Sequence, residues 1–304
     1  MCNHHQRTAH AHELQTTITR VPLQRINQPA RWSRRRLLVS AGLGTASMAI
    51  LAACGSDSGS SATSSEATTS TTTAGSGSEE EAGSGSAEAE GSDGSEEAAP
   101  VDEGAPASTE ELQLQHVSLG FVSAYVLVRG SEAAIVDTGV AGSGDAISEA
   151  LGDLGLMPAD VRHIVLTHNH GDHIGGLGEL EEAMTNATVY AGTGDIASIQ
   201  TALTLSEVGD GDEVFGMGVV NTPGHTEGSI SVFDTDTGLL VAGDAINGDG
   251  SGGITGANPD FTPDMDSANA SVAKMAALMP QVAAFGHGGE PVREDVANKL
   301  AAIG

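Results

Sequence analysis

Hydrophobic residues are distributed unevenly along this 304-residue chain. Up to about residue 110 the chain is polar apart from one weakly apolar run, whereas the remainder holds many apolar segments of strand or helix length. Strands are predicted at residues 112–117, 121–128, 133–136, 161–166, 188–191, 213–221, 229–233, 239–242 and 282–285. Helices are predicted at residues 144–154, 177–184, 195–203, 267–279 and 291–302.

The order of these segments predicts the fold class. The first two strands form a hairpin around Leu119-Gly120, and the later strands alternate with helices. Such an order indicates two sheets packed face to face with helices on the outside. We therefore predict one α/β (α+β) domain at residues 111–304, and no strand or helix of a core before it.

The densest group of metal-binding side chains directly follows a predicted buried strand. Three imidazoles and a carboxylate occur within six residues there. In an extended segment residues two apart point the same way, so His168 and His170 can bind one cation. Asp172 and His173 are adjacent and must diverge, so they suit a second cation or a water on the first. Free imidazoles packed this densely indicate a metal site.

This cluster resembles the signature of the metallo-β-lactamase superfamily, His-x-His-x-Asp-His. Four further motifs follow in that family's order: Ile135-Val136-Asp137-Thr138-Gly139, Thr222-Pro223-Gly224-His225-Thr226, Gly243-Asp244 and Gly286-His287-Gly288. The resemblance covers about residues 111–304. It implies a four-layer αβ/βα sandwich of the metallo-β-lactamase type.

The resemblance also implies two divalent metal ions, each held by three side chains and joined by a shared carboxylate. His168, His170 and His225 would bind one ion, Asp172, His173 and His287 the other, and Asp244 would bridge them. We expect zinc, with iron or manganese as alternatives, since neutral imidazole suits zinc or iron. Asp137 is expected to be a buried carboxylate that braces the metal loops.

The expected reaction is hydrolysis. A metal-bound water ionises near neutral pH, so a metal-bridging hydroxide would attack the substrate, with Asp172 as the catalytic residue that transfers a proton. Asp244 makes the site look more like glyoxalase II and lactonases than like lactamases with a cysteine ligand or histidines alone. The expected substrate is therefore a small ester, thioester, lactone or lactam.

Candidate substrate walls are the hairpin tip and the Gly-rich loop at residues 248–261, with apolar contacts from Phe121, Phe215 and Phe261. Two other classes of function stay open. A mononuclear iron oxygenase of persulfides resembles the same motif but needs a single iron. A non-catalytic metal-binding lipoprotein would keep the ligands without turning over a substrate.

Charge excludes some partners. The chain has 41 acidic and 12 Lys or Arg residues, a formal net charge of −29. Such a field repels phosphate backbones, so we expect no nucleic-acid partner. It also disfavours anionic lipid headgroups, and it favours a neutral or cationic small-molecule substrate.

The first third of the chain resembles an export signal followed by a tether. A basic segment with Arg34-Arg35 precedes a short apolar run and resembles a twin-arginine signal, and Leu51-Ala52-Ala53-Cys54 resembles a bacterial lipobox. We therefore predict a leader at residues 1–53, lipidation of Cys54 and a disordered Ser/Gly/Glu-rich tether at 54–110. The protein would be exported and bound to the extracytoplasmic face of a bacterial cell membrane by that lipid alone.

Overall fold

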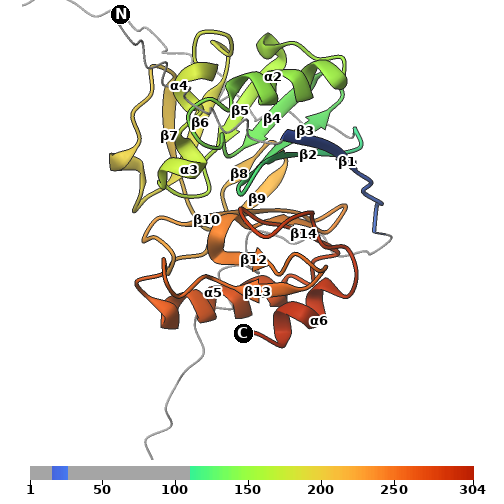
Figure 1. The fold of residues 1–304 in the computed structure, drawn as a ribbon, viewed down its shortest axis with the longest axis vertical. Helices are drawn as coiled ribbons and strands as arrows, with labels where there is room; N and C mark the ends of the chain where they lie inside the picture. The colour runs from blue at the N-terminus through green and yellow to red at the C-terminus, as the bar shows by residue number, and fades with distance from the viewer. Residues whose placement is uncertain (1–15, 27–109) are drawn as a thin grey trace, which may run out of the picture. The chain divides into compact units, whose positions relative to one another are not determined.

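The computed structural model describes residues 16–26 and 110–304. Two β-sheets lie face to face, and helices cover the outer face of each (Figure 1). The predicted tether, the lipidation site Cys54 and most of the predicted leader lie outside the described residues.

The first sheet has seven strands in the order β1-β2-β3-β4-β5-β6-β7. They are β1 (Thr16–Val21), β2 (Gln113–Leu119), β3 (Ser123–Arg129), β4 (Glu132–Val136), β5 (Val161–Val165), β6 (Thr188–Gly192) and β7 (Thr204–Val208). Neighbours from β1 to β4 are antiparallel, and those from β4 to β7 are parallel. The helices of this half are α2 (Gly144–Asp153), α3 (Gly171–Ile174) and α4 (Leu177–Leu180), with short 3₁₀ turns at Pro158–Asp160 and Ile196–Ser198.

The second sheet has five strands in the order β14-β11-β10-β9-β8. They are β8 (Glu213–Val214), β9 (Met217–Asn221), β10 (Ile230–Asp234), β11 (Leu239–Val241) and β14 (Val282–Ala284). A 3₁₀ turn, η3 (Gly243–Ala245), leads from β11 into a separate two-stranded ribbon of β12 (Ile246–Gly248) and β13 (Ile254–Gly256). Helices α5 (Met265–Ala277) and α6 (Val296–Ala301) complete this half.

Three hydrophobic cores separate four layers. Ile147 and Leu151 of α2 pack on the outer face of the first sheet, and Val272 and Met275 of α5 pack in the core that includes Leu240 of the second sheet. Strand β3 is buried on both faces, because its alternate residues enter either the outer core or the core between the sheets. Full burial of a large apolar side chain contributes about 1.5–3 kcal/mol. The predicted helix–sheet–sheet–helix sandwich is confirmed.

A buried ion pair joins the two sheets. The guanidinium of Arg129, at the end of β3, lies with Nη2 at 2.6 Å from Oδ1 of Asp234, at the end of β10. Arg129 also donates to the carbonyl oxygens of Phe215 and Glu110, at 3.2 and 3.3 Å. The other carboxylate oxygen of Asp234 accepts from the backbone N–H and the hydroxyl of Thr237. Both charges are therefore satisfied in a region closed to solvent.

Strand β1 was not expected from the sequence. It pairs with β2 over six residues, from Thr16 opposite Leu119 to Val21 opposite Leu114. Five of its six residues are β-branched, which favours a strand. The prediction of no structured element before the domain is therefore wrong for residues 16–21.

The other differences lie in short segments. Residues 195–203 do not form the predicted helix: only a 3₁₀ turn forms there, and the unpredicted strand β7 follows it. The helices predicted at 177–184 and 291–302 are shorter in the structure. Residues 248–261, predicted as a loop, contain part of β12 and all of β13.

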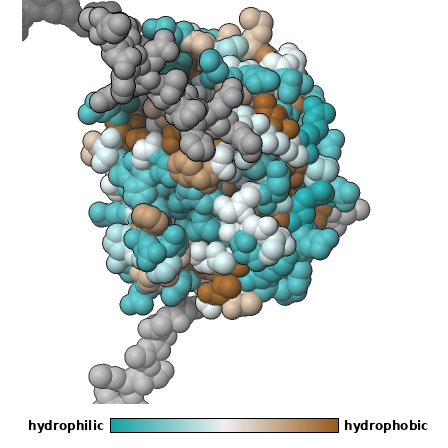
Figure 2. All heavy atoms as spheres, in the orientation of Figure 1, coloured by the Kyte–Doolittle hydropathy of each residue, from teal (hydrophilic) through white to brown (hydrophobic). Residues whose placement is uncertain are grey.

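The described surface is largely polar. The face drawn in Figure 2 is mostly hydrophilic, with hydrophobic side chains in small groups, as expected from the excess of acidic residues. Among the described helices, none has both the length and the apolar character needed to cross a bilayer.

Candidate metal centre

The seven predicted ligands come together in space. Each lies in a loop or short helix that follows a strand: the first four after β5, His225 after β9, Asp244 in η3 after β11, and His287 after β14. Three groups have all their candidate ligand atoms within 4.8 Å of one another. The groups are His168, His170 and His225; His168, His173 and Asp244; and Asp172, His173 and His287.

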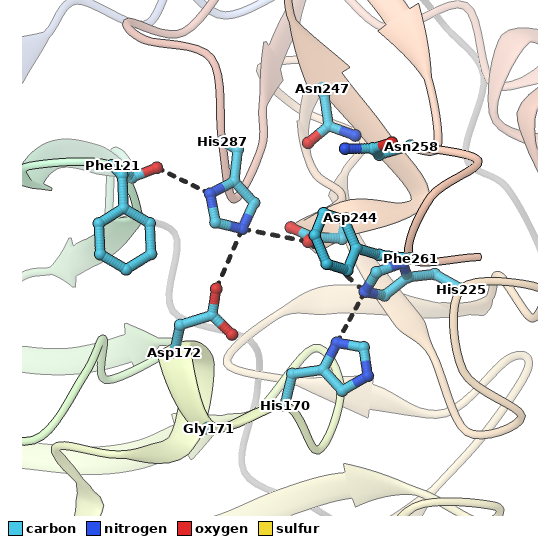
Figure 3. A pocket seen from close by; sticks show the side chains of 10 residues that line it. All are labelled: Phe121, His170, Gly171, Asp172, His225, Asp244, Asn247, Asn258, Phe261 and His287. Carbon is cyan, nitrogen blue, oxygen red and sulfur yellow. Dashed lines mark hydrogen bonds and ion pairs between the residues drawn. The ribbon is translucent and has the colours of Figure 1, made fainter.

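Asp244 lies between the group of His168, His170 and His225 and the group of Asp172, His173 and His287. Its carboxylate oxygens are 3.3 Å from Nε2 of His173, 3.5 Å from Nε2 of His225 and 3.2 Å from Nε2 of His287. Figure 3 shows Asp244 between His287 and His225, with His170 and Asp172 across the pocket from it. A carboxylate in this position can be shared by two cations.

The histidine side chains are oriented for metal binding. In four of them Nδ1 has a protein partner, which leaves Nε2 available to a cation, as is usual for metal-binding histidines. The Nδ1 partners are the hydroxyl of Thr167 for His168 (3.1 Å), the carboxylate of Asp137 for His173 (2.8 Å), the hydroxyl of Thr262 for His225 (3.3 Å) and the carbonyl oxygen of Phe121 for His287 (2.7 Å).

Two buried atoms of the centre lack a hydrogen-bond partner among the described residues. They are Nε2 of His168 and Oδ1 of Asp244. In addition, Nδ1 of His170 and Nε2 of His225 lie 2.9 Å apart, so both nitrogens point toward the same place. Buried polar atoms left unpaired are costly. Because imidazole nitrogens and carboxylate oxygens are ligands of divalent transition metals, the site fits such ions.

The pKa values of the histidines differ across the centre. Burial lowers the pKa of His168 well below its ordinary value, and burial also lowers the pKa of His225. Both rings are therefore neutral near pH 7, the form that binds metal. Burial would also lower the pKa of His173, but the charge and hydrogen bond of Asp137, together with Asp244, raise it to about 10.

The carboxyl groups of Asp137 and Asp244 explain why the pKa of His173 is raised whereas the pKa values of His168 and His225 are lowered. Burial would raise the pKa of Asp244, yet the nearby imidazoles of His173 and His287 hold it well below its ordinary value. Asp244 is therefore ionised near pH 7.

Asp137 braces the metal loops, as predicted. Its Oδ1 accepts from the backbone N–H of Thr167 and its Oδ2 from the Thr167 hydroxyl, both at 2.8 Å. Asp137 has a positive φ of 60° although it is not glycine, a conformation that costs free energy and is found at functional sites. This strained residue orients His173 and the chain immediately before His168.

Two glycines make the close approach of the loops feasible. A Cβ atom on Gly286 would overlap Oδ1 of Asp244 and Cε1 of His173, and one on Gly243 would overlap the Thr167 side chain. The glycines beside Asp244 and His287 are therefore required by the packing of the centre.

Asp195 is a positioning residue that the sequence did not reveal. It is buried, and its Oδ2 accepts from the backbone N–H of Asn169 at 3.0 Å and the hydroxyl of Thr226 at 2.6 Å. Its Oδ1 accepts from the backbone N–H of Gly228 at 3.0 Å. Asp195 thus joins the loop that carries His168 and His170 to the loop that carries His225.

Replacing Asp195 by asparagine should weaken metal binding. The amide keeps the shape of the carboxylate but loses one acceptor, so the two loops would no longer be held at the same separation. We expect a loss of affinity of roughly 10–100-fold, as for other groups that hold metal ligands in place, measured by competition with a chromophoric chelator. Asp153→Asn, on the exposed end of α2, should leave the affinity unchanged; equal losses in both variants would contradict the role of Asp195.

A pocket of about 610 Å³ opens beside the centre (Figure 3). Besides the candidate ligands His170, Asp172, His225, Asp244 and His287, it is lined by Phe121, Gly171, Asn247, Asn258 and Phe261. Phe121 and Phe261 were predicted to contact substrate, and both line the pocket. Phe215 does not: it lies in the turn between β8 and β9, and its ring contacts His163 instead.

Two further histidines have structural partners. His163 contacts the hydroxyl of Tyr190 in β6. His116, in β2, contacts Ser123 and Glu290, at 2.8 and 3.1 Å. Both are strand histidines outside the metal centre.

Comparison with known proteins gives consistent results. The family model described as Metallo-beta-lactamase superfamily matches residues 117–287. The uncharacterized protein YobT of Bacillus subtilis (strain 168) is 30% identical over 196 residues, which are 55% of this chain and 83% of that protein. The hydroxyacylglutathione hydrolase of Xylella fastidiosa (strain M12) is 37% identical over 109 residues, 34% of this chain and 39% of that enzyme.

Among solved structures, a metallo-beta-lactamase family protein from Thermus thermophilus is similar with a TM-score of 0.47 and 26% identity. That match covers 60% of this chain and 72% of the other. The chain thus spans most of YobT but well under half of the hydroxyacylglutathione hydrolase.

Proposed function

This chain belongs to the metallo-beta-lactamase superfamily, and on that premise we propose that its domain at residues 111–304 is a metal-dependent hydrolase of a small ester, thioester, lactone or lactam. The observation that carries the proposal is the convergence of seven side chains from four separate loops, in groups whose ligand atoms lie within 4.8 Å. The pocket beside them gives a substrate access to the centre.

The candidate ligands would have different roles in hydrolysis. His168, His170 and His225 would hold one divalent cation, and His173 and His287, with Asp172, the other. Asp244 would supply a carboxylate to both. When bound, such cations lower the pKa of a water toward neutrality and polarise a substrate carbonyl.

Asp172 is the group to which we assign proton transfer from the attacking water to the leaving group. In hydrolysis the water oxygen bonds to the carbonyl carbon, the bond to the leaving group breaks, and the leaving group takes up a proton. The Asp172 side chain is 30% exposed and lines the pocket. Its carboxylate would accept a proton from the attacking water and donate it to the leaving group.

Elemental analysis of the purified full chain, combined with assays on ester, thioester, lactone and lactam substrates, tests the proposal. We expect two divalent ions per chain, turnover of at least one class, loss of turnover after chelation and its return when zinc is added back. A single iron with oxygen consumption on a persulfide would favour the oxygenase. Two bound ions without turnover of any substrate would favour a metal-binding protein.

A further inference from the structure

The loop that carries His287, residues 286–290, begins on the β2–β3 hairpin. The backbone N–H of Ser123, at the start of β3, donates to the carbonyl oxygen of Gly286 at 2.8 Å. At the next loop residue, Nδ1 of His287 lies 2.7 Å from the carbonyl oxygen of Phe121 in the hairpin tip (Figure 3). The first two residues of the loop are therefore fixed on the hairpin.

The other end of this loop is joined to the same hairpin by a hydrogen-bonded series of side chains. Oε2 of Glu290 lies 3.1 Å from Nδ1 of His116 in β2, and Nε2 of His116 lies 2.8 Å from Oγ of Ser123. His116 and Ser123 are 1% and 4% exposed, whereas the Glu290 side chain is 57% exposed. Oε1 of Glu290 accepts from the hydroxyl of Thr19 at 3.4 Å. The series therefore runs from the surface to the buried start of β3.

The protonation of His116 gives the series a direction. Burial lowers the pKa of His116, although the charge of Glu290 acts in the opposite direction. The ring is therefore neutral near pH 7 and has one donor and one acceptor nitrogen. Nδ1–H donates to the carboxylate of Glu290, and Nε2 accepts from the hydroxyl of Ser123.

The series contains the groups of a hydrolytic triad, a serine, an imidazole and a carboxylate. A nucleophile must reach its substrate, but Ser123 is almost closed to solvent and is not among the residues that line the pocket. The series therefore connects parts of the fold. Between its attachment points lies His287, whose Nε2 is 3.3 Å from Asp172 and 3.2 Å from Asp244.

We propose that Glu290 and His116 are positioning residues for His287. They hold the loop after β14 against the hairpin, so that Nε2 of His287 points toward the cation that Asp172 and His173 would also bind. Neither Glu290 nor His116 belongs to the groups of candidate ligands. This inference rests on the metal centre of the proposed function and adds to it a connection that lies outside the five sequence motifs.

The loop also has an attachment on its other side. The backbone N–H groups of Gly248 and Gly250 donate to the carbonyl oxygens of His287 and Gly288, at 2.9 and 3.0 Å. Loss of Glu290 should therefore loosen His287 without releasing it. A group that must be ordered on binding contributes less to affinity, and the loss of a group that supports a metal ligand costs roughly 10–100-fold in affinity.

Glu290→Ala tests the proposal on the full chain, because this exposed side chain can be removed without opening the core. Competition with a chromophoric chelator, with zinc as the probe, gives the affinities for the two cations. We expect one affinity to fall roughly 10–100-fold and the other to stay unchanged. Glu290→Gln keeps an oxygen that accepts from His116, so it should recover most of the loss. Glu294→Ala removes another exposed carboxylate of the same segment and should change neither affinity.

Two altered backgrounds show whether the effect passes through His287. In a chain with His287→Ala, adding Glu290→Ala should weaken zinc binding no further, because the ligand that it positions is absent. A chain with Asp172→Ala loses a different ligand of the same cation and keeps His287, so Glu290→Ala should still weaken binding there. A difference between the two backgrounds measures the coupling of Glu290 to His287.

The same titrations can overturn the inference. Equal losses at both cations, equal further losses in the two backgrounds, or an unchanged affinity in Glu290→Ala would each remove the positioning role and leave the hydrolase function standing. If the unaltered chain does not bind two cations, the metal centre of the proposed function fails, and the inference fails with it.

Discussion

Replacing Asp244 by asparagine should abolish hydrolysis and reduce the metal content of the protein. Asp244 is the side chain whose oxygens lie within 3.5 Å of histidines from both halves of the centre. Asparagine keeps the size but removes the negative charge that two neighbouring cations need between them. Losing several kcal/mol of transition-state stabilisation corresponds to roughly a 10³-fold or greater fall in kcat/KM.

Elemental analysis and steady-state kinetics on the same preparation measure this effect. Asp249→Asn is a suitable control, because its exposed carboxylate accepts hydrogen bonds only from its own loop among the described residues. That variant should keep both metal and activity. A protein with Asp244→Asn that retains its full metal content and turnover would remove Asp244 from the centre.

Replacing Asp234 by alanine should cost about 3–5 kcal/mol of the free energy of unfolding. The change leaves the Arg129 guanidinium buried between the sheets without its carboxylate, and an uncompensated buried charge is strongly destabilising. The Thr237 turn also loses its acceptor. This cost is a large share of the roughly 5–15 kcal/mol that typically stabilises a domain. Urea denaturation of the metal-loaded protein measures it.

An exposed ion pair provides the comparison. Arg162 and Glu132 lie 3.7 Å apart on the surface, with about half of each side chain exposed. Glu132→Ala should therefore cost at most about 1 kcal/mol. Removing both buried charges, with Arg129→Met and Asp234→Ala together, should recover part of the loss. If Asp234→Ala were as mild as Glu132→Ala, the pair would not join the sheets energetically.

Local patterns in the sequence are sufficient to predict the histidine cluster and most core strands, whereas His225, Asp244 and His287 were predicted as ligands only through the family resemblance. His168 to His173 stand close together in sequence, and the strand before them is a largely apolar run, so neither needs tertiary information. Asp195 could not be predicted in this way, because its role depends on two loops that approach only in the folded chain.

The two missed strands of the first sheet, β1 and β7, are its edge strands, where the hydrophobic pattern is weakest. In β7 only Val208 is buried, and in β1 only Val21, so neither shows the regular alternation of a strand covered on one face. The run of β-branched residues in β1 was the available signal. The wrong helix at 195–203 has a related cause: Asp195 is fixed by three hydrogen bonds to other loops, which a propensity argument does not include.

The pairing of strand β1 has a consequence for the predicted removal of the leader. Under the export hypothesis, cleavage removes everything before Cys54. In the folded chain, however, residues 16–21 form the outermost strand of the larger sheet. Removal of that segment would make β2, whose residues are mostly buried, the edge strand in place of the more exposed β1. Processing at Cys54 would therefore replace a polar edge strand by a more apolar one, and apolar edge strands are prone to pair with other polypeptides.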